Sequence, residues 1–146
     1  MLITKQQAKA AIFELEGLKD SLYQVGFDFG GQSEKMLSEE AFVLLKSYLQ
    51  KTGADLANSA QIGAAIEKLM EKLIKLPSVN LTLAFEPSFF QLQRIFGWLQ
   101  VNARENLLIE LAVDAKILGG AIVEFEGKRR DYSVKKKLEE LNKLGI

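Results

Sequence analysis

Apolar residues in the first half of the chain recur every three or four positions, which is the spacing of α-helices with one buried face. The first predicted helix begins at the capping box Thr4–Gln7 and breaks at Gly26. The second follows Ser38 as its N-cap and stops at Gly53, and the third covers residues 55–76. Their apolar positions are Ala8, Ala11, Leu15, Leu18, Leu22 and Val25; Phe42, Leu45 and Leu49; and Ile62, Ile66, Leu69, Leu73 and Leu76. The first half is therefore predicted to be all helical.

The segment Gly26–Gly31 holds three glycines and two aromatic residues. Its glycine spacing matches neither the dinucleotide-binding fingerprint nor the P-loop, so it does not predict a phosphate site. We interpret it as a loop.

After Pro77 the apolar period changes from helical to two. Val79, Leu81, Leu83 and Phe85 alternate with smaller or polar residues, which predicts a strand with one buried face. The change of period indicates a boundary between a helical domain, residues 1–76, and an α/β domain, residues 77–146.

The rest of the chain adds strands and two helices. Pro87 is placed at the first position of a helix, followed by alternating strands over 107–113 and 121–125, a short returning strand over 129–131 and a last helix capped by Ser133. The predicted buried residues of the two helices are Phe89, Leu92, Phe96, Leu99 and Ala103, and Val134, Leu138, Leu141 and Leu144. The predicted fold class is α+β: an N-terminal helical bundle, then a small α/β domain in the order β-α-β-β-α.

Two apolar groups have a second interpretation as partner-binding residues. Leu15, Leu18 and Leu22 lie on the stripe of the first helix, which either faces the core or also receives a helix from a partner. Phe90, Trp98 and Val101 fall on the side of their helix opposite its buried stripe. They either meet more of their own chain or form a docking surface.

Composition narrows the possible functions. Hydrophobic residues make up 48% and charged residues 26%, the balance of a folded globular protein. Nineteen basic and nineteen acidic residues cancel, so no net field steers the chain to nucleic acid or anionic lipid. The chain has no Cys and no His, which excludes disulfides, thiolate or imidazole zinc sites, Cys nucleophiles and His bases. We expect no cofactor and no metal, and the absence of a signal peptide or long apolar stretch predicts a cytosolic or cytosol-facing protein.

A distinctive motif begins where the second predicted strand ends. Asp114 follows the strand, and after two residues comes the turn Ile117-Leu118-Gly119-Gly120. Glycines allow positive φ or a close backbone approach at such a bend, and Asp114 is suited to an Asx turn that fixes the end of the strand. The next strand and a polar turn lead to Asp131-Tyr132-Ser133-Val134.

In residue type, spacing and order of elements, the region from Val79 to Leu144 resembles the C-terminal signature of the delta subunit of F-type ATP synthases. The mitochondrial counterpart is the oligomycin-sensitivity-conferral protein. The motif residues are Asp114, Ile117, Gly119, Gly120, Asp131 and Ser133. The chain departs from the family in having Ala115 where proline is common, and in a shorter helical half with about three helices.

The resemblance implies a non-catalytic stator subunit of the peripheral stalk, which links the catalytic alpha-beta head to the b-subunit stalk. The helical half would bind N-terminal segments of alpha subunits, and the α/β half the C-terminal ends of b subunits. It implies no nucleic-acid partner, and a peripheral position on the cytoplasmic face of the cell membrane, reached only through the complex.

Two other functions remain as alternatives. The C-terminal region is rich in basic residues, namely Lys128, Arg129, Arg130, Lys135, Lys136, Lys137 and Lys143. This basic region is compatible with three interpretations: a nucleic-acid-binding adaptor, a surface that binds an acidic partner helix, or a helix face that is simply solvated. A small enzyme is the third possibility, with Glu124 and Glu126 as a carboxylate pair and Tyr132 as a further acid-base group.

Overall fold

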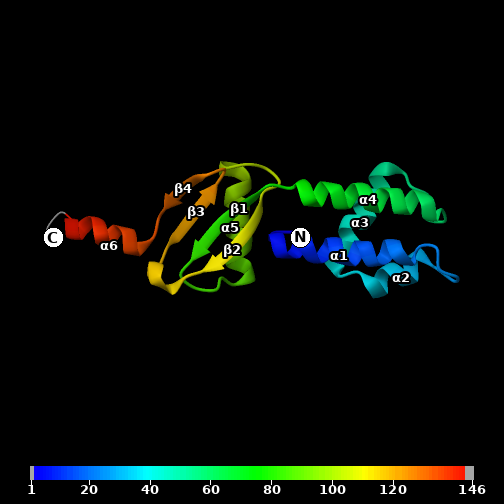
Figure 1. Cartoon of the computed structure of the whole chain (residues 1–146), viewed down its shortest axis with the longest axis horizontal. Coiled ribbons are helices and arrows are strands. Elements are labelled where there is room, and N and C mark those ends of the chain that lie inside the picture. Colours follow the sequence, from blue (N-terminus) through cyan, green and yellow to red (C-terminus); the bar gives the residue numbers. More distant parts are fainter. Residues whose placement is uncertain (1, 144–146) are drawn as a thin grey trace. The chain divides into compact units, whose positions relative to one another are not determined.

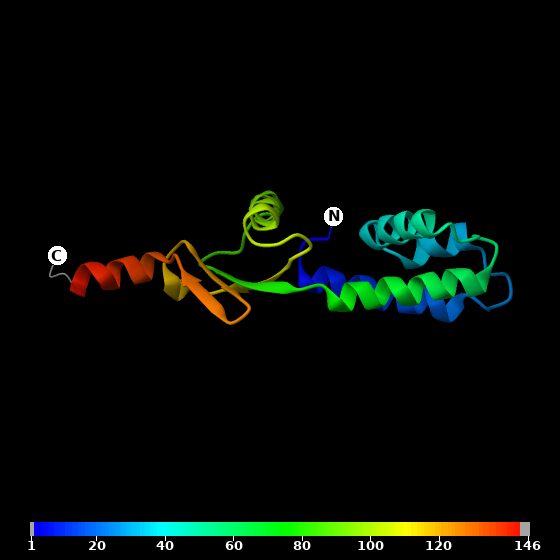
Figure 2. The same ribbon diagram turned by 90° about the horizontal axis from the view of Figure 1, so that it is seen from above.

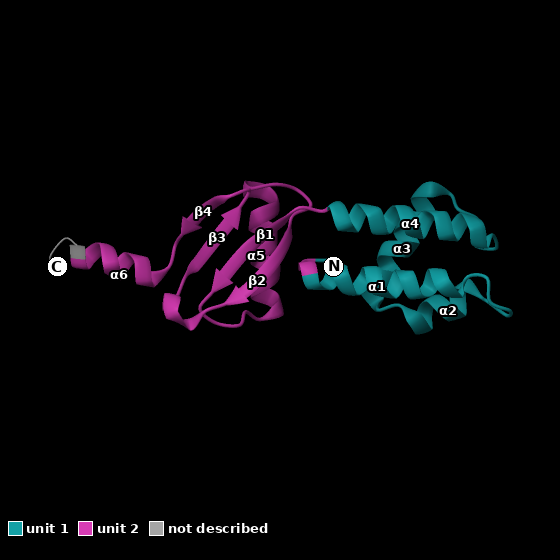
Figure 3. Cartoon of the chain, in the orientation of Figure 1, with its two compact units in different colours: residues 1–2, 6–75 teal, residues 3–5, 76–146 magenta. Residues whose placement is uncertain are grey.

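The computed structural model describes residues 2–143 of the chain (Figure 1). The described residues fall into two compact units (Figure 3). A helical unit contains residues 2 and 6–75, and an α/β unit contains residues 76–143 together with the short segment 3–5. The assignment of residues 3–5 to the second unit was not visible in the sequence pattern.

The helical unit holds four helices. They are α1 Lys5–Ser21, α2 Phe29–Met36, α3 Glu39–Thr52 and α4 Ser59–Lys75. Ser38 caps α3 by accepting a hydrogen bond from the amide of Ala41, and Gly53 ends it at φ 67°, as the sequence predicts. Most residues of the predicted stripes are buried, with Leu15, Leu18, Leu45, Ile62 and Ile66 at 0–1% exposure, whereas Phe42 and Leu76 are only half-buried. Val25, by contrast, is fully exposed.

The prediction of a loop over Gly26–Gly31 is wrong in its second part, because α2 begins at Phe29. The side chain of Asp28 accepts a hydrogen bond from the amide of Gly31 at 3.0 Å and so caps the helix. A Cβ atom on Gly31 would lie only 3.0 Å from that carboxylate. Gly31 therefore leaves room for the cap, and the unit has four helices where three were expected.

The α/β unit is built on a four-stranded sheet in the order β2-β1-β3-β4. The strands are β1 Ser78–Leu83, β2 Leu108–Val113, β3 Ala121–Phe125 and β4 Lys128–Asp131. β1 and β2 are parallel, whereas β3 is antiparallel to both β1 and β4. The crossover helix α5, Phe89–Asn102, covers one face of the sheet (Figure 2). A last helix, α6 Val134–Lys143, follows β4. The predicted α+β fold class is confirmed.

The core of this unit lies between α5 and the sheet. Val79 and Leu81 of β1, Ile109 of β2 and Leu99 of α5 are buried together with Ile3. The half-buried residues packed against them are Leu83, Leu92, Ile95, Phe96, Leu111, Ala121, Val123 and Phe125. Ile3 reaches this core because its carbonyl accepts a hydrogen bond from the amide of Ile109 at 2.9 Å, which covers the outer edge of β2.

Helix α5 begins two positions later than the sequence suggested. Ser88 is its N-cap and forms a capping box with Gln91, so Pro87 precedes the cap instead of opening the helix. Phe89 and Ala103, predicted to be buried, are exposed. Ile95 contributes to the core instead.

Candidate functional site

Asp114 ends strand β2 with the turn that the sequence predicts. Its carboxylate accepts a hydrogen bond from the amide of Lys116 at 3.0 Å, and its own amide donates to the carbonyl of Leu83 at 2.8 Å. A short 3-10 turn, η1 Ala115–Ile117, follows, and Ile117 is buried. The family's usual proline is therefore not needed here to form a defined turn.

The glycine pair is required by a close approach of two backbone segments. Gly120 has φ 74°, and a Cβ atom on it would lie 2.3 Å from the carbonyl oxygen of Tyr132. A Cβ on Gly119 would lie 3.0 Å from a methyl group of Val134. Leu118 also takes a positive φ, 69°, which no sequence signal indicated. Gly120 is thus the position where any side chain is excluded.

Asp131 and Ser133 fix the start of α6. The carboxylate of Asp131 accepts the amide of Ser133 at 2.8 Å, and the hydroxyl oxygen of Ser133 accepts the amide of Lys136 at 3.2 Å. Ser133 is only 2% exposed. Two backbone hydrogen bonds tie this segment to the glycine turn, from the amide of Tyr132 to Ala121 and from the amide of Val134 to Gly119. The two halves of the motif therefore form one structure that holds the base of α6.

The hydrogen bonds that Ser133 donates from its hydroxyl and its amide lower the pKa of Asp131 below its usual value of 3.8. A carboxylate whose pKa is lower in the folded state than in the unfolded state stabilises the fold when the pH lies above the unfolded-state pKa. This contribution is lost as the pH falls through the folded-state pKa. We therefore expect Asp131→Asn to be less stable than the wild type at pH 7, with a difference that shrinks below about pH 4. Urea unfolding of both proteins from pH 7 to pH 3 measures this, and a difference that stayed constant over that range would contradict it.

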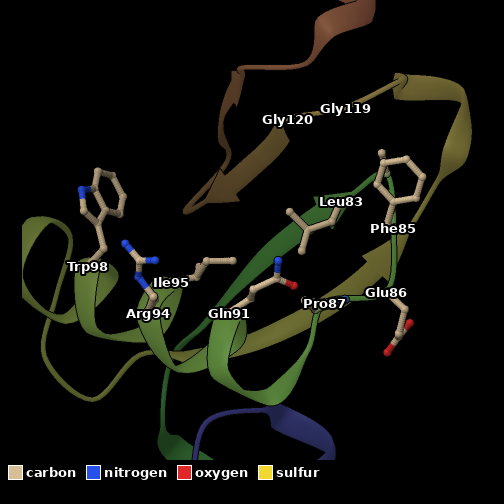
Figure 4. Close-up of a pocket in the computed structure, with 11 residues that line it drawn as sticks. Leu83, Phe85, Glu86, Pro87, Gln91, Arg94, Ile95, Trp98, Gly119 and Gly120 are labelled. Atoms are coloured by element: carbon tan, nitrogen blue, oxygen red, sulfur yellow. The ribbon is translucent and has the colours of Figure 1, made fainter.

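A groove of about 560 Å³ lies beside the glycine turn, between the end of β1 and helix α5 (Figure 4). Leu83 and Ile95 lie in its middle, with Trp98 and Arg94 toward one end and Phe85 toward the other (Figure 4). Its lining is mainly apolar, and Gly119 and Gly120 form part of its wall. The motif thus shapes one side of an apolar groove.

The candidate residues of α5 lie on the surface. Phe90 is 67% exposed, Trp98 58% and Val101 85%. Their spacing places them along the outer face of the helix, and Gly97 between them has no atom near the position of a Cβ. Phe85 and Arg94, which were not among the candidates predicted from the sequence, extend this surface into the groove. Phe85 was predicted to lie on the buried face of the strand, but β1 ends at Leu83 and Phe85 is 74% exposed. No sequence signal indicated Arg94.

Leu15, Leu18 and Leu22 of α1 are buried within the helical unit, at 0–2% exposure. A partner helix could contact them only if the helices of the unit separated. The large apolar side chains that α1 and the loop after it do expose are Phe13, Tyr23 and Val25.

Helix α6 does not bury its apolar stripe, contrary to the prediction. Val134, Leu138 and Leu141 are 39%, 46% and 43% exposed, and Leu144 lies outside the described residues. The stripe is correctly spaced for a helix, but the α/β unit has no further element to pack against it within residues 76–143.

The residues considered for an enzyme do not come together. Glu124 lies on β3, whereas Glu126 lies in the following turn at φ 51°, so the two do not share a strand face as expected. Tyr132 is 52% exposed, and none of the three lines the groove. Residues 2–143 contain no group of three carboxylates placed to hold a metal ion, and no helix there is long and apolar enough to cross a membrane.

The family comparison agrees with the motif. Residues 37–144 match the family described as ATP synthase delta (OSCP) subunit. Among solved structures, a chain of the Polytomella F-ATP synthase in a rotary state is similar, with 27% identity, a TM-score of 0.42, and coverage of 49% of this chain and 91% of that one. No curated protein matches. Because the family match spans well over half of the sequence, the chain belongs to the ATP synthase delta (OSCP) subunit family.

Proposed function

We propose that the protein is the stator subunit that joins the alpha-beta head of a rotary F-type ATP synthase to its b-subunit stalk. Its family consists of non-catalytic subunits of the ATP synthase peripheral stalk. In this proposal the helical unit binds N-terminal segments of alpha subunits, and the α/β unit binds the C-terminal ends of b subunits. The protein would then lie on the cytoplasmic face of the membrane, held there by the complex.

The observation that carries the proposal is the exposed apolar surface of α5 beside the motif-shaped groove. Large aromatic side chains such as Phe90 and Trp98 leave much of their area in water in the isolated chain. Burying one such side chain at an interface contributes roughly 1.5–3 kcal/mol, and Trp is common among the residues that dominate binding energy. An amphipathic helix of a b subunit is the expected occupant, with its apolar anchors in the groove.

The stator role requires stiffness as well as affinity. The torque of the rotor would rotate the head unless a rigid link held it, so the loops and turns of a stator subunit must not deform under load. The motif supplies such rigidity because its parts are joined by backbone hydrogen bonds, including the 2.8 Å bond between Tyr132 and Ala121. Its function in this proposal is mechanical, and its residues perform no chemistry.

The helical unit has a groove of its own that suits a short apolar segment. Its volume is about 380 Å³, and Phe29, Phe42, Leu49 and Leu56 contribute to its lining between α2, α3 and the loop after α3. Leu56 is 52% exposed. This groove supports binding of an alpha-subunit segment to the helical unit even though the stripe of α1 is buried.

Calorimetry with peptides tests the proposal. We expect the full chain to bind a peptide from the C-terminal end of a b subunit, and to bind a peptide from the N-terminus of an alpha subunit independently, since the two grooves belong to different units. Peptides of the same composition in scrambled order serve as controls. No heat with either peptide would rule out the stator function.

A further inference from the structure

The chain crosses between its two units twice. Residues 3–5, the N-terminal strap, belong to the α/β unit, residues 6–75 to the helical unit, and residues 76–143 to the α/β unit again (Figure 3). The first crossing lies at the start of α1, which begins at Lys5, and the second lies between α4 and β1. Units joined by one linker move relative to each other by default. A second crossing changes that expectation if the strap is firmly attached to the α/β unit.

The N-terminal strap is attached to the α/β unit by three different contacts. Ile3 is fully buried in the core of that unit, and its carbonyl accepts a hydrogen bond from the amide of Ile109 at 2.9 Å. Thr4 pairs with Ile109 as a parallel bridge. The Nζ atom of Lys5 lies 3.6 Å from Oε2 of Glu110, with both side chains nearly half exposed. A buried aliphatic side chain stabilises far more than such an ion pair, so Ile3 is the main anchor.

The strap holds only the first part of the outer edge of β2. Amides along a strand alternate in direction, and in β2 the amide of Leu108 donates to Pro77 on the side of β1. The next amide, that of Ile109, points the other way and donates to Ile3. Within the described residues β2 is an edge strand of the sheet, and its pairing with β1 does not involve the strap. The strap can therefore detach while the sheet stays closed.

The two crossings enter the α/β unit at the same end of β2. Ser78, the first residue of β1, pairs with Leu108, and Thr4 pairs with Ile109 on the opposite side of β2. Neighbouring strands lie about 4.8 Å apart, so the two crossings are separated by roughly 10 Å. Two attachment points at this separation resist rotation, because turning about one connection is blocked by the other.

Neither crossing has slack. Helix α1 begins at Lys5, inside the strap itself, so no loop separates the attached residues from the helix. At the second crossing only Leu76 and Pro77 lie between α4 and β1. Proline fixes its own φ and restricts the backbone of the residue before it. Both connections are therefore short and stiff.

We propose that the N-terminal strap restrains twisting and bending between the two units by closing a second connection, and that its release frees this motion while each unit stays folded. Only the use of this restraint, to carry torque through a stator subunit, rests on the proposed function. A strap that merely covered the edge of β2 would protect the sheet from pairing with other chains, but it would leave the motion between the units unchanged.

Motion between the units is measured on the full chain by double electron–electron resonance. The chain has no cysteine, so Lys68→Cys on α4 and Glu124→Cys on β3 supply the only two thiols for spin labels. Both residues are exposed, and neither contributes to the attachment of the strap. The width of the distance distribution between the labels reports the motion. We expect a narrow distribution for this labelled parent protein.

Variants of the strap separate its main anchor from its ion pair. Ile3→Asp places a charge in an apolar core, which expels the strap. We expect this variant to broaden the distance distribution at least about twofold. Lys5→Gln removes the ion pair but keeps Ile3 in place, and should leave the width unchanged. Ile3→Ala removes most of the anchor without burying a charge, and should broaden the distribution less than Ile3→Asp.

Amide hydrogen exchange shows whether a variant has released the strap alone. The amide of Ile109 is bonded to Ile3, whereas the amide of Leu108 is bonded to Pro77. In Ile3→Asp we expect exchange at Ile109 to accelerate at least about tenfold, and exchange at Leu108 less than about threefold. Circular dichroism and the fluorescence of Trp98 check that each variant is folded. If Ile3→Asp does not fold, Ile3→Ala is judged by the same measurements.

A distribution as narrow after release of the strap as in the parent would overturn the proposal. A parent distribution already as broad as that of Ile3→Asp would overturn it too, as would equal broadening by Lys5→Gln. An unchanged width together with retained binding of the b and alpha peptides would remove the restraint and leave the stator function standing. Broadening on release without binding of either peptide would remove the stator function and leave the restraint.

Discussion

Replacing Gly120 by Ala is expected to destabilise the α/β unit by about 3 kcal/mol or more. The new Cβ atom would lie 2.3 Å from the carbonyl oxygen of Tyr132, 3.2 Å from its carbonyl carbon and 3.3 Å from the Cα of Ser133. All three are backbone atoms, so no side-chain rotation relieves the clash. The hydrogen bonds Tyr132–Ala121 and Val134–Gly119 on either side keep the two segments together, and the φ of 74° adds strain for any residue with a side chain.

The measurement is urea unfolding followed by circular dichroism and by the fluorescence of Trp98, the single tryptophan of the chain. Gly127→Ala is the matched control, since Gly127 has φ 78° but no atom within 4 Å of an added Cβ. We expect Gly127→Ala to lower the free energy of unfolding by only about 1 kcal/mol, which is the cost of positive φ alone. If Gly120→Ala and Gly127→Ala lowered the free energy of unfolding equally, the close approach of Gly120 to Tyr132 would not contribute to stability.

Replacing Trp98 by Ala is expected to weaken binding of a peptide from the C-terminal end of a b subunit by about thirtyfold or more, equivalent to roughly 2 kcal/mol. Trp98 is 58% exposed, lines the groove beside the glycine turn and lies on the same helical face as Phe90 and Val101. Its exposed area is available for burial by a partner. Because much of the side chain already lies in water, its loss should change the stability of the free protein far less than its affinity.

Phe13→Ala provides the control for this binding experiment. Phe13 is a large aromatic residue, 79% exposed, but it belongs to the helical unit. We expect it to leave the affinity for the b-subunit peptide unchanged. Calorimetry measures the affinity of both variants for the b-subunit peptide. If Trp98→Ala bound this peptide as tightly as the wild type, the docking surface would lie elsewhere.

Local signals in the sequence predicted much of the fold. Ser38 and Gly53 delimit α3 as expected, because capping and positive φ depend on only a few neighbouring residues. Asp114 forms its turn for the same reason, within two residues of itself. The α+β class followed from the change of apolar period after Pro77.

What the sequence could not reveal depends on contacts between distant segments. The approach of Gly120 to Tyr132 joins residues on opposite sides of the β3–β4 hairpin, so the pattern identified the glycine pair but not which glycine is irreplaceable. Ile3 joins the second unit through Ile109, far along the chain. Periodicity marks which side of a helix is apolar, but it does not tell whether another element covers that side. It therefore gave the same prediction for the buried Leu15 and the exposed Leu138.

The measurement that tests the stator function most directly is coupling in membranes. If the proposed function is correct, ATP synthase membranes stripped of their delta subunit would hydrolyse ATP on a head that the stalk does not hold, so hydrolysis should not drive ion transport. Adding the full chain to membranes from its own source should restore ATP-driven transport, and the Trp98→Ala variant should restore much less at the same concentration. Full transport without the protein, or none after saturating addition of the folded wild-type chain, would contradict the proposed function.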